Sequence, residues 1–224
     1  DFLGDAVFGR LPGDLRLAVH ALAQFDRFCP DLAAAALRAG REDLLFADLQ
    51  RRHLLLIPLD SECHWFRFHH LAGDYLRRHD PRSVREIRAS LTRGGQWLFG
   101  QDMVDDAIDC TVRAQEWDVA CGWLVRAAED AAQRQGDGAN LLRWAAAIPP
   151  EVLDRYPLIR LSHVFSLAFN HRAAEFEREL VNLETLAARL ATDPTADPRT
   201  VGELLCALPV QRMMWEGLHD QGRG

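Results

Sequence analysis

The densest cluster of side chains that could bind a metal lies in the segment CHWFRFHH, residues 63–70. Cys63, His64, His69 and His70 are all of types that bind zinc. If this segment is a regular strand, alternation places Cys63 and His69 on one face and His64 and His70 on the other. No C-x-x-C or H-x-x-H pair elsewhere in the sequence supplies the remaining ligands of a tetrahedral site. The sequence therefore favours an ordinary aromatic hairpin over a zinc site here.

The residue types give little support for nucleophilic catalysis. All 26 residues counted as Lys or Arg are Arg, so the chain has neither a P-loop lysine nor a Schiff-base lysine. The nucleophile motif G-x-S-x-G is absent. The five cysteines form no C-x-x-C pair, which predicts reduced thiols in a cytoplasmic protein: Cys29, Cys63, Cys110, Cys121 and Cys206. We therefore expect no catalytic residues and no enzymatic activity in this chain.

The charge balance argues against direct binding of nucleic acid. The formal net charge is −7, and neither residues 1–80 nor residues 81–224 are basic, whereas nucleic-acid-binding domains usually carry a basic face. The segment 41–52 stands where a winged helix carries its recognition helix. Acidic residues lie near its N-terminal end, at Glu42 and Asp43, so packing against protein is the better interpretation. No apolar run approaches 18 residues, so no membrane-spanning helix is expected.

The pattern of residues 1–79 predicts a winged-helix domain. Apolar spacing and breaks at proline and glycine predict helices over 1–9, from Pro12-Gly13-Asp14 onward, from Pro30 to Gly40, and over 41–52. Two β-rich runs, 53–60 and 63–70, are joined by a short polar link and predict a hairpin, with Pro58 on an edge strand. A helix over 71–78 then leads to a boundary at 79–81. Several short helices followed by a hairpin are the outline of a winged helix.

The remainder, residues 80–224, reads as helical throughout and predicts a tetratricopeptide-like α-solenoid. Turn signals separate helices that are expected over 82–100, 102–115, 117–135, 138–147, 157–171, 173–192 and 199–218. Small residues at Ala107 and Ala120 would let neighbouring helices pack closely, although the strict 34-residue repeat pattern is not present at full strength. The predicted fold class is mainly α, with one β-hairpin.

Two features of the helical region bear on ligands and partners. Four tryptophans could line a groove, but tryptophans in paired helices more often belong to the core: Trp97, Trp117, Trp123 and Trp144. A solenoid needs capping repeats at its ends. We therefore expect an exposed apolar end, with self-association or end disorder, near Leu204, Leu205, Leu208, Met213, Met214 and Trp215.

The runs HLLLIPLD (53–60) and HWFRFHHLAGDYL (64–76) resemble the MalT-like, LuxR-type ATP-dependent transcription activators, a group of STAND nucleotide-binding proteins. FDRFCPDLAAAAL (25–37), VDDAIDCTVRAQEWDVACGWL (104–124) and LLRWAAAIPPEVLDRYPLIRL (141–161) resemble further segments of that family in the same order. The resemblance covers roughly residues 1–190. It implies an upstream nucleotide-binding domain, a winged helix, a helical-repeat sensor and a downstream DNA-binding domain, of which this chain would contain the middle two. The chain begins without Met, and its end also suggests a piece of a longer protein.

The resemblance also implies a cofactor contact at His69. FHHL (68–71) is similar to the methionine-histidine-aspartate element of related STAND proteins, in which the histidine reaches the phosphates of ADP. His69 would thus contact ATP or ADP, bound with Mg in the upstream domain of the full-length protein, while the present chain holds no cofactor. The structural alternative is a capping or core histidine where the hairpin meets the next helix.

For the whole chain, the resemblance implies regulatory signal sensing, with an inducer or a regulatory protein on the helical repeats. The alternative is a free-standing helical-repeat scaffold that binds protein partners.

Overall fold

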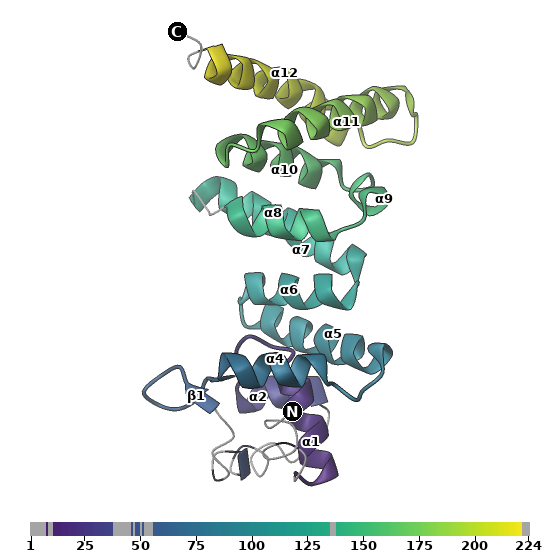
Figure 1. Ribbon diagram of the computed structural model, residues 1–224. Helices are drawn as coiled ribbons and strands as arrows, with labels where there is room; N and C mark the ends of the chain where they lie inside the picture. Colours follow the sequence, from purple (N-terminus) through teal and green to yellow (C-terminus); the bar gives the residue numbers. More distant parts are fainter. Residues whose placement is uncertain are drawn as a thin grey trace. The chain divides into compact units, whose positions relative to one another are not determined.

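The computed structural model describes residues Phe8, 11–37, Phe46, 48–49, 51, 56–134 and 138–220. The chain divides into two compact units, Asp1–Glu116 and Trp117–Gly224, and each is described by itself (Figure 1). The helix expected over 1–9 and most of the helix expected over 41–52 lie outside the described residues.

In its described residues, the first unit contains the other predicted helices and the hairpin in the predicted order. They are α1 (Gly13–Leu22), α2 (Pro30–Leu37), β1 (Leu56–Pro58), β2 (Phe66–Phe68), α4 (His70–Arg78), α5 (Val84–Gly100) and α6 (Val104–Ala114). Helix α5 begins with a capping box, in which Ser83 and Glu86 satisfy each other's backbone N–H groups. The unit extends past the boundary predicted at residues 79–80, because α5 packs on α2.

The hairpin is antiparallel, and its second strand is shorter than the run 63–70 from which it was predicted, while residues 53–55 of the first run lie outside the described residues. Leu56 pairs with Phe68 and Pro58 with Phe66, and a further bridge joins Phe66 to Phe28, with two N–O distances of 2.8 Å. Cys63 adopts a left-handed φ of 52° within the turn. The regular alternation considered for residues 63–70 is therefore wrong, because β2 spans only Phe66–Phe68 and α4 begins at His70.

Aromatic side chains hold the hairpin to the helices before it. The ring of Phe28 lies 5.0 Å from Phe68 and 5.9 Å from Phe46, and the rings of Phe46 and Phe66 are 5.7 Å apart. All four side chains are buried. These tilted and edge-on contacts are the favoured geometries of aromatic pairs.

Two adjacent glycines let α5 approach its neighbours closely. A Cβ atom at Gly95 would lie 3.2 Å from the carbonyl oxygen of Ala107, so α6 packs directly on the backbone of α5. A Cβ atom at Gly94 would lie 2.3 Å from Cε1 of Phe25, a buried ring in the connection after α1. The close packing expected at Ala107, which is fully buried, is confirmed for this helix pair.

We expect Gly94→Ala to destabilise the first unit by about 1–3 kcal/mol, the usual cost of overpacking a core. The clash with Phe25 outweighs the higher helix propensity of alanine, which is worth about 1 kcal/mol. Chemical denaturation measures the difference. Gly100→Ala in the same helix is the control, because nothing lies within 4 Å of its Cβ position. Equal stabilities of the two variants would contradict the predicted clash.

The second unit is entirely helical in its described residues. Its helices are α7 (Trp117–Arg134), α8 (Gly138–Ala147), α9 (Pro150–Leu153), α10 (Pro157–Phe169), α11 (Ala173–Thr192) and α12 (Pro198–Asp220). The short α9 was not expected, because Pro149-Pro150 reads as a break, yet proline is well suited to the first turn of a helix. Helix α10 packs against α8, α11 and α12, as expected for a tetratricopeptide-like α-solenoid.

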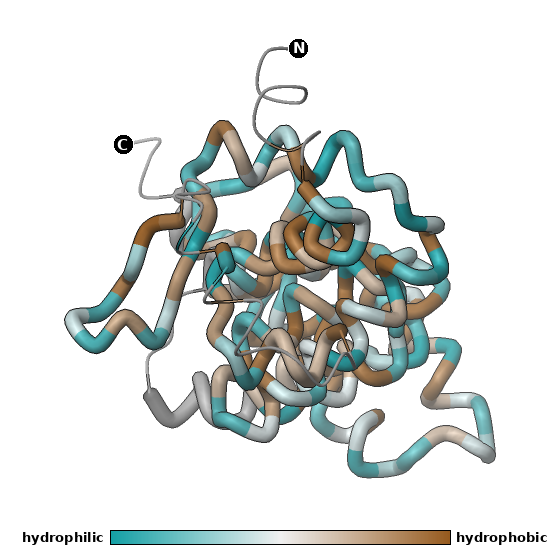
Figure 2. The backbone as a smooth tube through the Cα atoms, turned by 90° about the horizontal axis from the view of Figure 1, so that it is seen from below, coloured by the Kyte–Doolittle hydropathy of each residue, from teal (hydrophilic) through white to brown (hydrophobic). Residues whose placement is uncertain are grey.

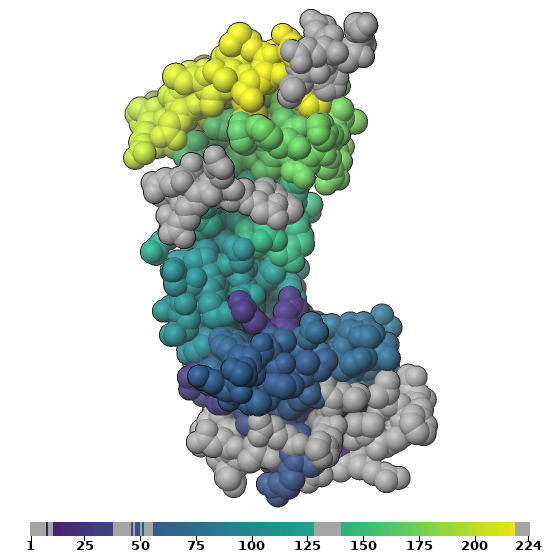
Figure 3. All heavy atoms as spheres, turned by 90° about the vertical axis from the view of Figure 1, so that its left-hand side faces the viewer, coloured from purple at the N-terminus to yellow at the C-terminus, as the bar shows by residue number. Residues whose placement is uncertain are grey.

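The apolar end predicted on α12 is wrong for half of its residues. Leu204, Leu208 and Trp215 are buried in one core with residues of α8, α10 and α11, and α12 lies directly on α11 (Figure 3). Leu205, Met213 and Met214 are exposed, as predicted. The helix presents one apolar stripe to the core and another to solvent, and the sequence does not distinguish the two. Along the whole chain, hydrophobic and hydrophilic residues alternate in short stretches (Figure 2).

Candidate functional site

His69 lies between the second strand of the hairpin, β2, and the start of helix α4. It occupies the N-cap position of α4, and its carbonyl oxygen accepts a hydrogen bond from the backbone N–H of Gly73 at 2.9 Å. Its side chain is half-buried and makes no capping hydrogen bond. The two imidazole rings of His69 and His70 lie 4.2 Å apart. The imidazole of His69 therefore stands beside a helix N-terminus, a position that favours anions.

Of the cluster considered as a zinc site, Cys63 and His64 do not join His69 and His70. Cys63 and His64 lie exposed in the turn, where the carboxylate of Asp60 accepts hydrogen bonds from the backbone N–H groups of His64 at 2.8 Å and Trp65 at 2.9 Å. The hydrogen bond from His64 is the main reason that the pKa of Asp60 lies below its usual value. Among the residues that the structure describes, no three His, Cys, Asp or Glu side chains come together as a metal site.

A buried ion pair connects α4 to α5 and was missed by the sequence analysis. The guanidinium of Arg82 donates to the carboxylate of Asp80 at 2.7 Å, and the side chains are 10% and 2% exposed. The amide of Gln24 donates to the same carboxylate at 3.0 Å. Burial alone would raise the pKa of Asp80, but the hydrogen bonds from Arg82 and Gln24 outweigh it and the pKa is lowered. The charged carboxylate is thus fully compensated inside the unit.

Arginines from α4, α5 and α6 bind the carbonyl groups at the ends of α1 and α2. Arg77 donates to the carbonyl oxygen of Ala23 at 3.0 Å, and Arg93 donates through Nε to that of Ala36 at 3.1 Å. Arg113 donates to the carbonyl oxygen of Gln24 and, at 2.9 Å, to its side-chain Oε1. Carbonyl groups at helix C-termini lack intrahelical partners and favour cations. We call these three arginines, with Gln24, Asp80 and Arg82, the junction network.

The junction network is built from residues that no local pattern marks. The sequence signal at 79–81 was the Asp-Pro dipeptide, which indicates a chain break and was interpreted as a domain boundary. Arginine is common throughout this chain, so nothing in the sequence separates these four from the other arginines. Only the packing of α1 and α2 against α4, α5 and α6 brings donor and acceptor together.

His20 lies buried beside this network. Its Nδ1 atom donates to the carbonyl oxygen of Leu76 at 2.8 Å, which joins α1 to α4. Burial lowers the pKa of His20 below 6.5; Asp80 raises it, whereas Arg82 and Arg16 lower it further. The side chain is 4% exposed and is best accommodated as the neutral imidazole.

We expect the stability of the first unit to fall as the pH decreases through the range below 6.5. The folded state holds His20 neutral, so its contribution is complete above the unfolded pKa and is lost as the unfolded chain takes up the proton. In His20→Asn the amide can still donate to Leu76 but does not titrate. The variant should lose less thermal stability than the wild type between about pH 7.5 and about pH 5.5. An unchanged pH profile would contradict this, and exposed His64→Asn is the control.

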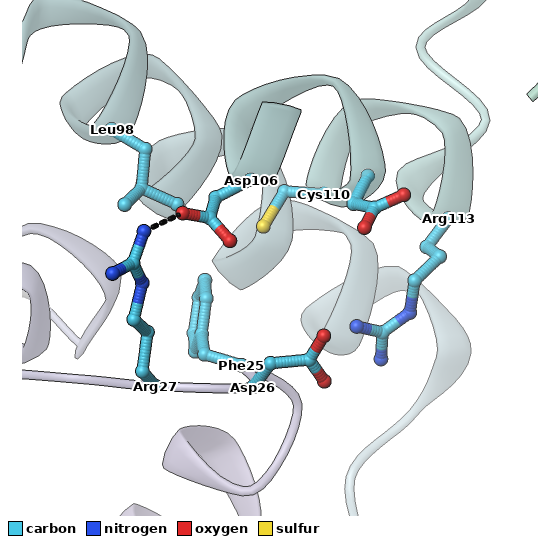
Figure 4. Close-up of a pocket in the computed structure, with 8 residues that line it drawn as sticks. Phe25, Asp26, Arg27, Leu98, Asp106, Cys110 and Arg113 are labelled. Carbon is cyan, nitrogen blue, oxygen red and sulfur yellow. Dashed lines mark hydrogen bonds and ion pairs between the residues drawn. The ribbon is translucent and has the colours of Figure 1, made fainter. Parts of the chain in front are cut away.

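The described residues of the first unit line a small cavity and a larger open groove. A cavity of about 20 Å³ is bounded by Phe25, Arg27, Asp106 and Cys110 among others, and is large enough for one water molecule only (Figure 4). Burial raises the pKa of the Cys110 thiol to about 12, so it is not a nucleophile at neutral pH.

The larger hollow is an open groove of about 340 Å³ between α1, α2 and α5. Arg82 and Arg93 line it, together with apolar side chains of α1 and α2. Both arginines already donate to protein oxygen atoms, so the groove is not a ready-made phosphate site.

The four tryptophans that could line a groove differ in how deeply they are buried. Trp144 is buried in the second unit, whereas Trp97, Trp117 and Trp123 are half-buried. Trp97 packs 6.3 Å from Trp65 at the tip of the hairpin, which ties the wing to α5. These positions agree with packing rather than with a ligand groove.

This chain is similar to known HTH-type transcriptional regulators. Residues 4–86 match the family model of the MalT winged helix domain. The HTH-type transcriptional regulator MalT of Vibrio parahaemolyticus is 31% identical over 182 residues, which cover 77% of this chain and 19% of that protein. The HTH-type transcriptional regulator AlkS of Ectopseudomonas oleovorans is 22% identical over 190 residues, covering 83% of this chain and 21% of that protein.

A relative that is named as a protein kinase is similar along nearly the whole chain. The serine/threonine-protein kinase PknK of Mycobacterium tuberculosis is 24% identical over 211 residues, which cover 93% of this chain and 19% of the kinase. The chain thus spans about a fifth of the length of these curated relatives. Within the described residues, no helix is both long and apolar enough to cross a membrane. The predicted relationship is confirmed: the chain is MalT-like and LuxR-type, and its residues 4–86 match the family of the MalT winged helix domain.

Proposed function

We propose that this chain is the regulatory and signal-sensing part of an ATP-dependent LuxR-family transcription activator. The winged helix transmits the nucleotide state of an upstream domain, and the helical repeats bind an inducer or a regulatory protein. The observation that carries the proposal is the match of residues 4–86 to the MalT winged helix domain. The junction network supports it, because it ties the winged helix to the first two solenoid helices within one compact unit.

Within this proposal the chain itself has no catalytic residues and binds neither nucleic acid nor membrane. ATP or ADP, with Mg, belongs to the upstream domain, and His69 is the contribution of this chain to that site. A half-buried imidazole at the start of α4, not used for capping, can donate to a phosphate oxygen. Because that donor meets a charged acceptor, its hydrogen bond is worth about 1.5–3 kcal/mol.

The test is the ADP affinity of the complete protein with His69→Ala. Loss of the hydrogen bond should weaken ADP binding by about 10- to 150-fold and raise inducer-independent transcription, because ADP holds the resting state. The adjacent His70→Ala is the matched control, since His70 is exposed, and it should leave ADP affinity unchanged. The chain of 224 residues alone should bind no nucleotide measurably. Unchanged ADP affinity and basal transcription in His69→Ala would leave only a structural role for His69.

A second candidate is a helical-repeat scaffold that binds protein partners. The similarity to PknK favours it, because segments similar to this chain then occur both in a protein kinase and in a transcriptional regulator. The reading frame upstream of Asp1 separates the two candidates. A continuous frame that encodes G-x-x-x-x-G-K-[ST] supports the regulator, whereas a start codon immediately before Asp1 supports the scaffold.

A further inference from the structure

The open groove of about 340 Å³ in the first unit has an apolar floor between three helices. Ala18 and Ala21 of α1 and Ala36 of α2 line it, and they are 9%, 1% and 0% exposed. Leu17 of α1 and Ala89 of α5 also line the groove, and both are exposed. Because the floor residues are almost inaccessible while other lining residues are exposed, the groove narrows towards its floor. The flat surface of another protein would bridge its mouth rather than fill it.

The charged side chains that line the groove balance one another. Two are basic and two are acidic: Arg82, Arg93, Asp14 and Glu86. Arg82 is paired with Asp80, and Arg93 donates to the carbonyl oxygen of Ala36. The carboxylate of Glu86 accepts a hydrogen bond from the backbone N–H of Ser83 at 2.8 Å. The lining thus has no net charge, so a charged ligand would lose hydration there without adequate compensation.

A buried hydroxyl group lies on the side of α5 that borders the groove. Ser90 follows Glu86 by four residues and precedes Arg93 by three, so the three side chains are neighbours on the helix surface. Ser90 is 2% exposed, and within the described part of the chain its Oγ atom has no hydrogen-bond partner. Buried polar side chains nearly always have such a partner. Because the serine side chain can rotate about χ1, a ligand in the groove can supply one.

We propose that this groove binds an uncharged small molecule with an apolar body and one hydrogen-bonding group. The alanine floor contacts the body, and the hydroxyl of Ser90 pairs with the polar group. The volume of about 340 Å³ lies within the roughly 300–1,000 Å³ of small-molecule sites, which are mostly apolar with a few polar groups.

The role of this ligand as an inducer rests on the proposed function. Helix α5 is the first helix of the predicted solenoid, whereas α1 and α2 belong to the winged helix, and all three line the groove. A ligand held there contacts both parts at once. It would therefore act where the winged helix meets the helical repeats.

The first test is a fluorescence titration of the chain with N-phenyl-1-naphthylamine, an uncharged apolar probe with one N–H donor. Wild-type protein should bind it saturably. Leu17→Glu replaces an apolar wall of the groove with a charge and should weaken binding by about tenfold, which corresponds to about 1.4 kcal/mol. Leu59→Glu on the hairpin is the matched control, because the two leucines are 46% and 44% exposed and Leu59 does not line the groove. Its dissociation constant should equal that of the wild type.

The second test concerns the hydrogen bond to Ser90. Ser90→Ala should weaken binding of N-phenyl-1-naphthylamine by about two- to tenfold, the usual contribution of one neutral hydrogen bond. The affinity for 1-phenylnaphthalene, which has no N–H group, should be unchanged in the same variant. Equal losses for the two probes would show that Ser90 supports the fold and is not a ligand contact, and would overturn the proposal.

Three further results would also overturn it, provided that circular dichroism shows the variants folded. They are the absence of saturable binding, an unchanged probe affinity in Leu17→Glu, and a dimer in sedimentation that Leu17→Glu breaks, which would assign the groove to a second copy. The titrations involve neither nucleotide nor promoter. Their failure is therefore distinct from failure of the regulator proposal, which the ADP affinity of His69→Ala tests.

Discussion

Asp80→Ala is expected to lower the free energy of unfolding of the first unit by about 3–5 kcal/mol, the usual cost of removing one partner of a buried ion pair. The carboxylate is 2% exposed and accepts hydrogen bonds from Arg82 and Gln24. Its loss leaves the Arg82 guanidinium buried without its counter-ion and deprives Gln24 of its acceptor. Urea denaturation of the wild type and the variant, followed by circular dichroism, measures the difference.

Asp74→Ala is the control for this prediction. Asp74 also forms an ion pair, with Arg77 at 2.7 Å, but both side chains are well exposed. Exposed pairs contribute little to stability, so no measurable change is expected. If Asp80→Ala were as stable as Asp74→Ala, the junction network would make no contribution to the fold.

Trp215→Ala is expected to destabilise the second unit by about 3–5 kcal/mol, as is usual for large aromatic side chains removed from a core. Trp215 is 8% exposed and stacks on Phe176 of α11, which is fully buried in the core that α8, α10, α11 and α12 share. The loss removes this aromatic contact and leaves a cavity near the end of α12. Thermal unfolding followed at 222 nm measures the effect on the helical signal.

The control is Met213→Ala, two residues away and 65% exposed. Because its side chain contacts mainly solvent, its removal should change the stability by less than about 0.5 kcal/mol. The sequence alone predicted an exposed apolar end that included Trp215. Equal small effects of the two substitutions would restore that interpretation and reject the buried core of α12.

The helices of the second unit could be predicted well because their boundaries depend on local chemistry. The breaks at Pro157 and at DPTADP (193–198) separate the helices where proline and aspartate disfavour continuation. The hairpin was likewise visible as two β-rich runs. Its second strand is shorter than the predicted run, because the left-handed residue Cys63 and the turn held by Asp60 end the strand pairing at the tip of the hairpin.

The candidate site could be predicted only in part, because its remaining features arise from tertiary packing. His69 was identified through family resemblance, and the structure places it at the start of α4. The junction network joins residues such as Gln24 and Arg113, which are 89 positions apart, and no periodicity or motif connects them. The buried side of α12 was missed for a related reason: apolar residues occur on both of its faces, and only the neighbouring helices decide which is covered.

Native-state amide hydrogen exchange tests whether the winged helix and the first solenoid helices unfold as one body. We expect the slowest amides of α1, α4, α5 and α6 to open with the same free energy, and Asp80→Ala to lower all of these values together. The opposite result is that α5 and α6 keep their amide protection in Asp80→Ala while α1 and α4 lose theirs. That result would contradict unfolding as one body. The two segments would then be independent, with no coupling through the junction network.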